Sequence, residues 1–402
     1  MSIVLDRPYR FIPPHRGNLW PSLIQKFRMV DHYLRLKEGV HSFECRNLEV
    51  FQELLESQKG LLLTPNHCRY ADPLAMGWPA RLAKTHVYAM ASWHLFNKSW
   101  LDGFAIRKMG GFSVHRESSD RQSLEAAMQI LASAERPLIL FPEGTTSRMN
   151  DSVKELLDGV SFIARSAARK ASKQYGRSVV VLPVAIKYLC KGDARPWISE
   201  HACQLEDYFG FKRGNSLRLV ARVQRLAEHW LSQMESSVFG SARSGATSQR
   251  RHDLVSEMLG RLDEQLGIQS EDVDFSMRIR QIRSKIIAKR FGDQSNRIGD
   301  LKIASKEVIQ CQDLMTFDEQ YISGESVSDT RLVEALQRMQ ESCWGKAKLS
   351  MPLHAIIRFG GGIAVPDEKA PRSQRDPLLT EIKLQLESML QKLAQEAGTI
   401  DS

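Results

Sequence analysis

The sequence has few of the features that mark exported or membrane-spanning proteins. Its 6 cysteines are scattered without close pairs, which argues against a zinc ribbon or a disulfide framework and favours a reducing, cytoplasmic setting. No apolar run reaches the roughly 18 residues of a membrane-spanning helix. The apolar run before Asp6 and Arg7 is too short for a signal peptide. We therefore expect no export and no membrane span, and a peripheral protein on the cytoplasmic face of a membrane.

The charge balance is strongly basic. The net charge is +9 and the isoelectric point is near 9.2, which favours anionic partners such as nucleic acid, acidic lipid headgroups or a phosphorylated substrate. The sequence has no RNP-type motif, zinc-finger spacing or array of basic-zipper heptads, so a nucleic-acid partner is not expected.

Short apolar runs alternate with longer helical patterns between residues 60 and 187, which is typical of an α/β layer. We expect a mixed, largely parallel sheet flanked by helices, with a long helical insertion. Strands are predicted at residues 60–64, 86–90, 112–115, 137–141 and 179–186. Asp72 with Pro73, and Ser152 with Glu155, predict two helix starts after loops.

Changes in composition and in apolar periodicity along the sequence predict four segments. Residues 1–37 are an N-terminal segment in which residues 17–37 form one basic amphipathic helix, either packed on the core or lying on a membrane. Residues 38–189 are the α/β core, and residues 190–350 are a helical insertion. Residues 351–402 are C-terminal strands and a helix that complete the core.

A second basic amphipathic helix is predicted inside the insertion. Phe275, Ile279, Ile282 and Ile286 form one apolar stripe, and arginines and lysines flank it. Such a helix either packs on the main domain or attaches to an anionic membrane.

The strongest candidate for chemistry is His67 with Asp72, in a loop after a predicted strand. Five helical steps rotate about 500°, so these side chains do not share a helix face and meet only if the loop folds back. If they meet, Asp72 can fix the imidazole tautomer and leave the second nitrogen as a base for a hydroxyl that the substrate supplies. The structural alternatives are that His67 is a loop histidine with its hydrogen bonds made inside the protein, and that Asp72 only caps a helix. The neighbouring Cys68 is disfavoured as a nucleophile, because adjacent extended residues point to opposite sides.

Two further segments carry anion-binding groups. Arg116 ends a predicted strand and could hold a phosphate or carboxylate bidentately, although strand-end arginines are commonly plain surface residues. The loop at residues 142–148 offers Glu143, Gly144, Thr145 and Arg148, and it could grip a polyol phosphate or serve only as a turn.

In this order, the segments resemble the glycerolipid acyltransferase family, which includes glycerol-3-phosphate and 1-acylglycerol-3-phosphate acyltransferases. Asn66-His67-x4-Asp72 is similar to the catalytic H-x4-D block, and residues 110–116 are similar to the acceptor-binding block G-x-(I/F)-x-(V/I)-x-R. Residues 141–145 resemble the F-P-E-G-T block, and residues 182–186 resemble the apolar fourth block with its proline.

The resemblance implies a role for each matching residue. His67 would be the base and Asp72 its orienting carboxylate, and Pro183 would lie on the acyl-donor side. The implied substrate-binding residues are Asn66, Arg116, Glu143, Gly144, Thr145, Arg148 and Pro183. Two positions depart from the pattern, because Thr146 stands where the family often has arginine and Ser113 stands where a large apolar residue is common.

The resemblance also implies a reaction in phospholipid biosynthesis. A fatty acyl group would pass from an acyl thioester, acyl-CoA or acyl carrier protein, to a hydroxyl of glycerol-3-phosphate or 1-acylglycerol-3-phosphate. The thioester is a co-substrate, and no metal, other cofactor or acyl-enzyme is expected. Membrane is the expected third partner, and an aromatic group could lie near it or pack in the core: Trp78, Trp93, Phe96, Trp100 and Phe104. The alternatives are another lyso-lipid or amino-alcohol lipid as acceptor, or a catalytically silent lipid-binding protein.

Overall fold

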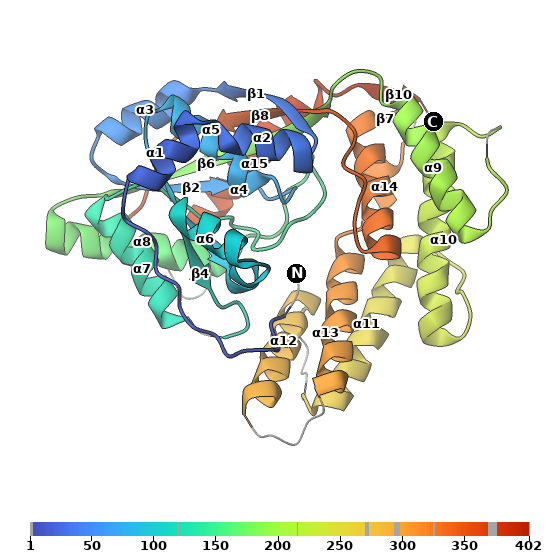
Figure 1. The fold of residues 1–402 in the computed structure, drawn as a ribbon. Helices are drawn as coiled ribbons and strands as arrows, with labels where there is room; N and C mark the ends of the chain where they lie inside the picture. Colours follow the sequence, from blue (N-terminus) through green and yellow to red (C-terminus); the bar gives the residue numbers. More distant parts are fainter. Residues whose placement is uncertain are drawn as a thin grey trace.

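The main sheet is mixed and mostly parallel. The computed structural model describes residues 3–118, 120–214, 216–269, 273–292, 298–317, 319–324, 326–368 and 376–401. In this part of the chain the sheet has eight strands, seven of them in the order β1-β8-β6-β2-β5-β3-β4, with β9 beside β6. Only the contacts of β6 with β8 and β9 are antiparallel. The expected α/β class is confirmed (Figure 1).

The strands lie close to their predicted positions, although β5 is shorter and β6 is longer than expected. The main-sheet strands are β1 Val40–Arg46, β2 Gly60–Pro65, β3 Tyr88–Ser92, β4 Gly111–Val114, β5 Leu138–Ile139, β6 Val179–Cys190, β8 Leu353–Phe359 and β9 Ile363–Ala364. All residues of β2 are buried, as expected for a central strand covered on both faces.

Alternate residues of β6 divide between two hydrophobic cores. Val179, Val181 and Ala185 face the core that contains α7, α8 and α15, whereas Leu182 and Ile186 face the larger core on the other side.

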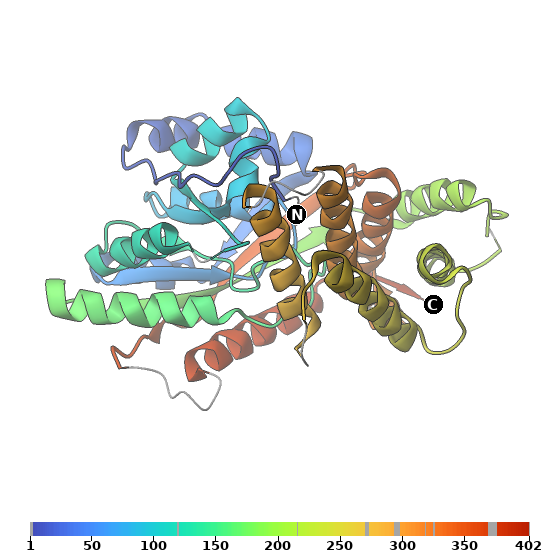
Figure 2. The same cartoon turned by 90° about the horizontal axis from the view of Figure 1, so that it is seen from below.

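The helices of the α/β part are α3 Leu48–Glu56, α4 Asp72–Ala75, α5 Gly77–Leu82, the 3-10 helix η1 Trp93–Asn97, α6 Trp100–Lys108, α7 Arg121–Ser133, α8 Asp158–Tyr175 and α15 Pro377–Ala394. Figure 2 shows α8 and α15 along the lower face of the sheet.

A helical region between β6 and β8 packs at one end of the sheet (Figure 1). Its elements are α9 Arg195–Phe209, α10 Leu219–Phe239, α11 Thr247–Leu266, α12 Phe275–Phe291, α13 Ile298–Met315, the 3-10 helix η2 Glu319–Ile322, β7 Ser326–Ser328 and α14 Asp329–Trp344. Strand β7 pairs with the C-terminal strand β10, Thr399–Asp401. In α12 the residues Ile279, Ile282 and Ile286 are buried, and the helix packs chiefly against α11 and α13.

Two predicted helix boundaries are wrong. The single helix expected at residues 17–37 is two helices, α1 Leu19–Lys26 and α2 Met29–Lys37, because Arg28 adopts a left-handed backbone conformation with φ of 53°. The helix start expected at Ser152 lies further along the chain, since α8 begins at Asp158 after an extended Leu157. The hydroxyl of Ser152 therefore does not cap the N-terminus of α8.

The N-terminal segment runs along the edge strand β4. Ser113 forms two hydrogen bonds with Ile12 of this segment. Its backbone N–H donates to the Ile12 carbonyl, and its hydroxyl accepts the Ile12 N–H at 2.8 Å. The Tyr9 hydroxyl donates to Asp120 at 2.5 Å and lies 3.2 Å from the Ser113 hydroxyl. This pairing gives Ser113, which departs from the family pattern, a structural role at the sheet edge.

Within the described ranges, no helix combines the length and apolar character needed to cross a membrane.

Candidate active site

The loop after β2 is fixed at its start by Asn66. The Asn66 side-chain amide donates to the Ile186 carbonyl at 3.0 Å, and its oxygen accepts the Ile186 N–H at 2.7 Å. Asn66 is fully buried and turned toward β6. Asn66 therefore anchors the loop to β6, and both polar atoms of its side-chain amide form hydrogen bonds with the Ile186 backbone.

His67 and Asp72 meet because this loop folds back. The Asp72 carboxylate accepts the backbone N–H of Arg69 at 2.8 Å, which closes the turn, and its same oxygen lies 2.9 Å from His67 Nδ1. Its other oxygen accepts the Tyr188 hydroxyl at 2.8 Å. Asp72 is fully buried and His67 nearly so. A carboxylate held by these donors keeps the proton on Nδ1 and leaves Nε2 as the basic nitrogen.

Glu143 clamps two loops together. One carboxylate oxygen accepts the backbone N–H of His67 at 2.7 Å, and the other accepts that of Lys154 at 3.0 Å. Burial raises the pKa of Glu143, and the two backbone bonds oppose this shift. In this structure Glu143 therefore positions the His67 backbone through direct hydrogen bonds.

The basic nitrogen of His67 faces a hydroxyl group. Thr146 Oγ1 lies 3.2 Å from His67 Nε2, while the backbone N–H groups of Ser147 and Arg148 donate to the carbonyls of His67 and Cys68. This pairing of the two loops holds Thr146 at the imidazole. An alcohol at this position is correctly placed to lose its proton to His67.

Arg116 reaches the same loop from the end of β4. Its guanidinium donates to the carbonyl of Gly144, a residue with φ of +69° whose Cβ, if present, would collide with Leu157. The pKa of Arg116 is lowered to about 10, chiefly by burial and next by the positive charge of the nearby Arg283. The Lys154 amino group lies 3.5 Å from the Thr145 hydroxyl.

Besides Asn66, two further predicted substrate-binding residues point elsewhere. Arg148 is buried, pairs with Glu341 of α14 and lies 4.5 Å from the centre of the Tyr70 ring. Pro183 is buried in β6 opposite Thr64, and its carbonyl accepts the Gly360 N–H at 2.9 Å. The structure thus gathers His67, Asp72, Glu143, Gly144, Thr145 and Arg116 around two loops, and it places Asn66, Arg148 and Pro183 behind them.

Residues 42–187 match the family model described as Acyltransferase. The match covers β1 to β6 and includes both loops of the site. It supports an acyltransferase domain in this part of the chain and, with it, a general acyltransferase activity. No curated protein matches the chain significantly.

The helical region supports the loop of His67 and Asp72 from behind. The Arg69 guanidinium donates to Gln337 at 3.1 Å and lies 3.6 Å from Glu334, both on α14. Glu334 also accepts the Tyr321 hydroxyl at 2.7 Å and the Asn150 N–H at 3.2 Å. These buried contacts tie the acyltransferase domain to α14.

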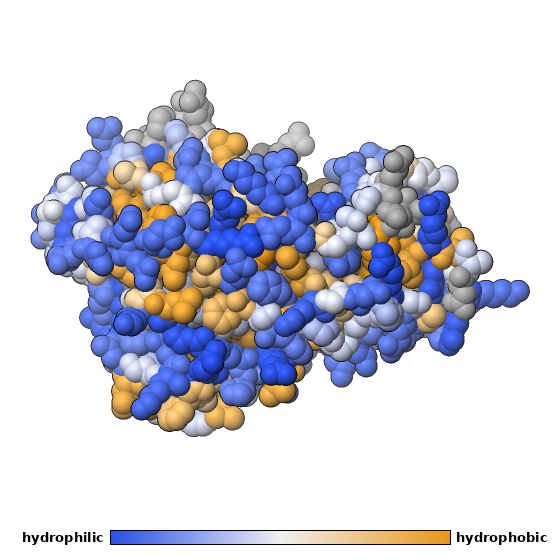
Figure 3. Space-filling view, turned by 90° about the horizontal axis from the view of Figure 1, so that it is seen from above, coloured by the Kyte–Doolittle hydropathy of each residue, from blue (hydrophilic) through white to orange (hydrophobic). Residues whose placement is uncertain are grey.

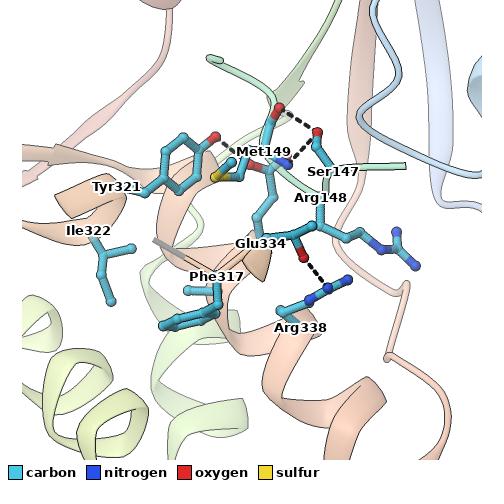
Figure 4. A pocket seen from close by; sticks show the side chains of 10 residues that line it. Ser147, Arg148, Met149, Phe317, Tyr321, Ile322, Glu334 and Arg338 are labelled. Carbon is cyan, nitrogen blue, oxygen red and sulfur yellow. Dashed lines mark hydrogen bonds between the residues drawn. The ribbon is translucent and has the colours of Figure 1, made fainter. Parts of the chain in front are cut away.

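A small cavity lies between the two parts (Figure 4). Its volume is about 20 Å³, and its lining includes Arg148, Tyr321, Glu334 and Arg338. This volume suits roughly one water molecule and is far too small for an acyl chain. The cavity is therefore a small packing gap lined by both polar and apolar side chains, among them Phe317 and Ile322.

Three contributors to the site lie outside the predicted set. Tyr188 bonds Asp72, Thr146 faces His67, and Lys154 donates its backbone N–H to Glu143. A signal for Tyr188 exists in the sequence, because it follows Ile186 by two residues and so lies on the same face of a strand. Cys68 is fully buried and burial raises its pKa well above the usual range, in agreement with its rejection as a nucleophile.

Proposed function

We propose that the protein transfers a fatty acyl group from an acyl thioester to a hydroxyl of glycerol-3-phosphate or 1-acylglycerol-3-phosphate. The observation that carries this proposal is the buried pair of Asp72 and His67, 2.9 Å apart, with His67 Nε2 facing a hydroxyl oxygen at 3.2 Å. The thioester is acyl-CoA or acyl carrier protein, and phospholipid biosynthesis is the setting that we infer.

The reaction needs only groups that surround this pair. His67 Nε2 takes the proton of the acceptor hydroxyl while its oxygen attacks the thioester carbonyl, and Asp72 stabilises the imidazolium that forms. The tetrahedral intermediate then expels the thiolate, which recovers a proton from His67 as the ester is completed. Arg116 supplies positive charge for the acceptor phosphate beside the Gly144 carbonyl.

A panel of acceptors tests this function. Thiol release from acyl-CoA and from acyl carrier protein would be measured with glycerol-3-phosphate, 1-acylglycerol-3-phosphate, other lyso-lipids and amino-alcohol lipids. We expect transfer to a phosphorylated glycerol acceptor, and a loss of 10²- to 10⁴-fold in kcat for folded His67→Ala, the range typical of general-base catalysis. Transfer only to other acceptors would replace the proposed substrate class. Lipid binding without any thiol release would favour the catalytically silent alternative.

We also propose that the enzyme works on a membrane surface through an exposed apolar surface on α1, α2 and α6. This lipid-facing surface consists of Leu19, Trp20, Phe27, Met29, Tyr33, Leu36, Trp100 and Leu101, all of which are exposed. Leu36 and Trp100 are 78% and 76% exposed, far more than core packing would leave. Figure 3 shows apolar side chains between hydrophilic ones on the face that includes α1 and α2.

The lipid-facing surface also carries positive charge and borders the site. Four exposed cations lie on or next to α1 and α2: Lys26, Arg28, Arg35 and Lys37. Trp20 of α1 contacts Phe104 of α6 at 5.2 Å between ring centres, and α2 packs against α4, which begins at Asp72. Aromatic rings beside cations suit the headgroup region of an anionic membrane. Of the aromatic residues for which the sequence left both an interface and a core position open, Trp78, Trp93 and Phe96 are buried in the protein.

A further inference from the structure

The arginine Arg283 of α12 lies on the buried face of its helix. It follows Ile279 and Ile282 and precedes Ile286 at helical spacing, so all four side chains point into the protein. Arg283 is 8% exposed, whereas Arg280 and Lys285 on the same helix are exposed. A buried arginine on an otherwise apolar helix face needs a specific anionic contact.

That contact lies beside the acceptor-side arginine. Arg283 donates to Glu117 at 2.5 Å, and Glu117 directly follows Arg116 in the loop after β4. The second Glu117 oxygen is 3.5 Å from His115 Nε2. Two guanidinium groups from distant parts of the chain therefore converge on one short loop, one from the acyltransferase domain and one from the helical region.

The two arginines are close enough to influence each other. Burial is the largest cause that lowers the pKa of Arg116, the positive charge of Arg283 is the second, and Glu117 acts in the opposite direction. The pKa of His94 is lowered to about 3, chiefly by burial, and the positive charges of Arg116 and Arg283 are among the smaller causes. The two guanidinium groups outnumber the single carboxylate of Glu117 between them, and this excess of positive charge favours an anionic ligand.

The position of this charge suits an acceptor that carries a phosphate. Arg116 donates to the Gly144 carbonyl, and Thr146, two residues later, faces His67 Nε2 at 3.2 Å. Two residues span at most about 7 Å. A phosphate held at the arginines could therefore present a hydroxyl of the same small molecule to the base.

We propose that Arg283 of the helical region completes the phosphate-binding part of the acceptor site together with Arg116. The ligand class is a phosphomonoester on a short polyol, and the inference rests on the proposed function for its biological acceptor. In this arrangement the helical region is part of substrate selection, because it supplies a cation that residues 42–187 do not contain.

Direct binding tests the proposal independently of turnover. Binding of sn-glycerol 3-phosphate and of inorganic phosphate to the full chain would be measured by calorimetry for wild type, Arg283→Gln, Arg283→Lys and Arg280→Gln. We expect the dissociation constant for glycerol 3-phosphate to rise at least about tenfold in Arg283→Gln, to recover partly in Arg283→Lys, and to stay within about twofold in the matched control Arg280→Gln. Absence of phosphate binding in wild type, or unchanged binding in folded Arg283→Gln, would overturn the proposal.

A second set of variants separates ligand binding from a structural ion pair. If Arg283 only neutralises Glu117, the double variant Glu117→Gln with Arg283→Gln should regain wild-type phosphate affinity, because no buried charge is left alone. We expect the double variant to stay at least about tenfold weaker than Glu117→Gln alone. Regained affinity would overturn the proposal.

Steady-state kinetics would show whether the arginines bind the phosphate of the acceptor or a phosphate of the acyl-CoA donor. In Arg283→Gln we expect the KM for the phosphorylated acceptor to rise about tenfold while the KM for acyl-CoA stays within about twofold. A rise confined to acyl-CoA would place a donor phosphate at the arginines and overturn the assignment to the acceptor. If wild type binds glycerol 3-phosphate through Arg283 but transfers no acyl group, the proposed function fails and the binding inference stands.

Discussion

The phenolic hydroxyl of Tyr188 donates to Asp72 at 2.8 Å, on the carboxylate oxygen that His67 does not use. Burial raises the pKa of Tyr188 well above its usual range, and the negative charge of Asp72 acts in the same direction, so the hydroxyl remains a donor. Tyr188 thus orients the carboxylate that holds the imidazole of His67, although it lies 116 residues from Asp72 in sequence.

Tyr188→Phe removes this donor without changing the shape of the ring. We expect kcat to fall about tenfold with little change in KM, since a hydrogen bond to a charged group is worth about 1.5–3 kcal/mol and only part of that acts in the transition state. Steady-state kinetics would measure the change. Tyr208→Phe, at an exposed tyrosine, is the matched control. An unchanged kcat in Tyr188→Phe would contradict a positioning role.

Thr146→Val tests the hydroxyl that faces His67. We expect kcat to stay within about threefold, because the acceptor supplies the reacting hydroxyl and Thr146 only occupies its position in the free enzyme. The measurement is acyl transfer at saturating acceptor. A loss of more than 100-fold, together with an acyl adduct on Thr146 in mass spectra of wild type, would show a covalent acyl-enzyme instead.

Glu143→Gln tests the clamp between the two loops. The amide can accept only one of the two backbone N–H groups that Glu143 now binds, so the other N–H faces an NH₂ group in a buried position. We expect a loss of about 1–3 kcal/mol in the free energy of unfolding and a lower kcat. Urea denaturation would measure the stability. Stability equal to that of wild type would show that Glu143 does not hold the loops.

His94 in η1 should make stability depend on pH. Burial lowers its pKa from the ordinary 6.5 to about 3, so the unfolded chain binds a proton between these values and the folded protein does not. The stabilisation is therefore complete above pH 6.5 and is lost as pH falls, by up to about 1.4 kcal/mol per pH unit.

The measurement for His94 is urea unfolding at pH 7.5 and 5.5. We expect the difference between the two conditions to shrink by about 1 kcal/mol in His94→Asn. The exposed His32 of α2 provides the control, since His32→Asn should keep the wild-type difference. An equal pH response in His94→Asn and wild type would contradict the assignment.

The lipid-facing surface predicts weaker membrane binding when charge is introduced. Trp100→Glu should reduce binding to vesicles of phosphatidylglycerol and phosphatidylcholine at least tenfold, because an exposed ring on α6 is replaced by a carboxylate that the anionic surface repels. Leu384→Glu, at a 57% exposed leucine of α15 on the opposite side of the sheet, is the control. Sedimentation with vesicles measures both variants, and an equal loss in both would contradict a specific surface.

Local patterns in the sequence predict the local features of this site well. The spacing of His67 and Asp72 identified the pair and the condition under which they meet, and the turn closed by Arg69 satisfies that condition. Apolar runs located β2 and β6 because buried strands have a strong pattern. The boundary near Arg28 was missed because its left-handed conformation has no glycine to mark it.

Long-range contacts explain what the sequence could not predict. Asn66 and Arg148 have the polar groups of binding residues, but Ile186 and Glu341 occupy those groups, and these partners lie 120 and 193 residues away. The approach of Arg283 to Glu117 spans 166 residues. No periodicity or motif encodes such a pairing, since it depends on how helices pack on the finished sheet.

The position of β8 in the sheet has a consequence for how the chain must be made. Among the strands that the structure describes, β1 joins the sheet only through β8, and β8 lies between β1 and β6 although it follows the helical region in sequence. During synthesis, about 300 further residues must therefore be made after residues 40–46 before β8, the strand that pairs with them, leaves the ribosome. A fragment that ends near residue 190 would leave β1 without its pairing strand, and we expect it to aggregate rather than fold into a working enzyme.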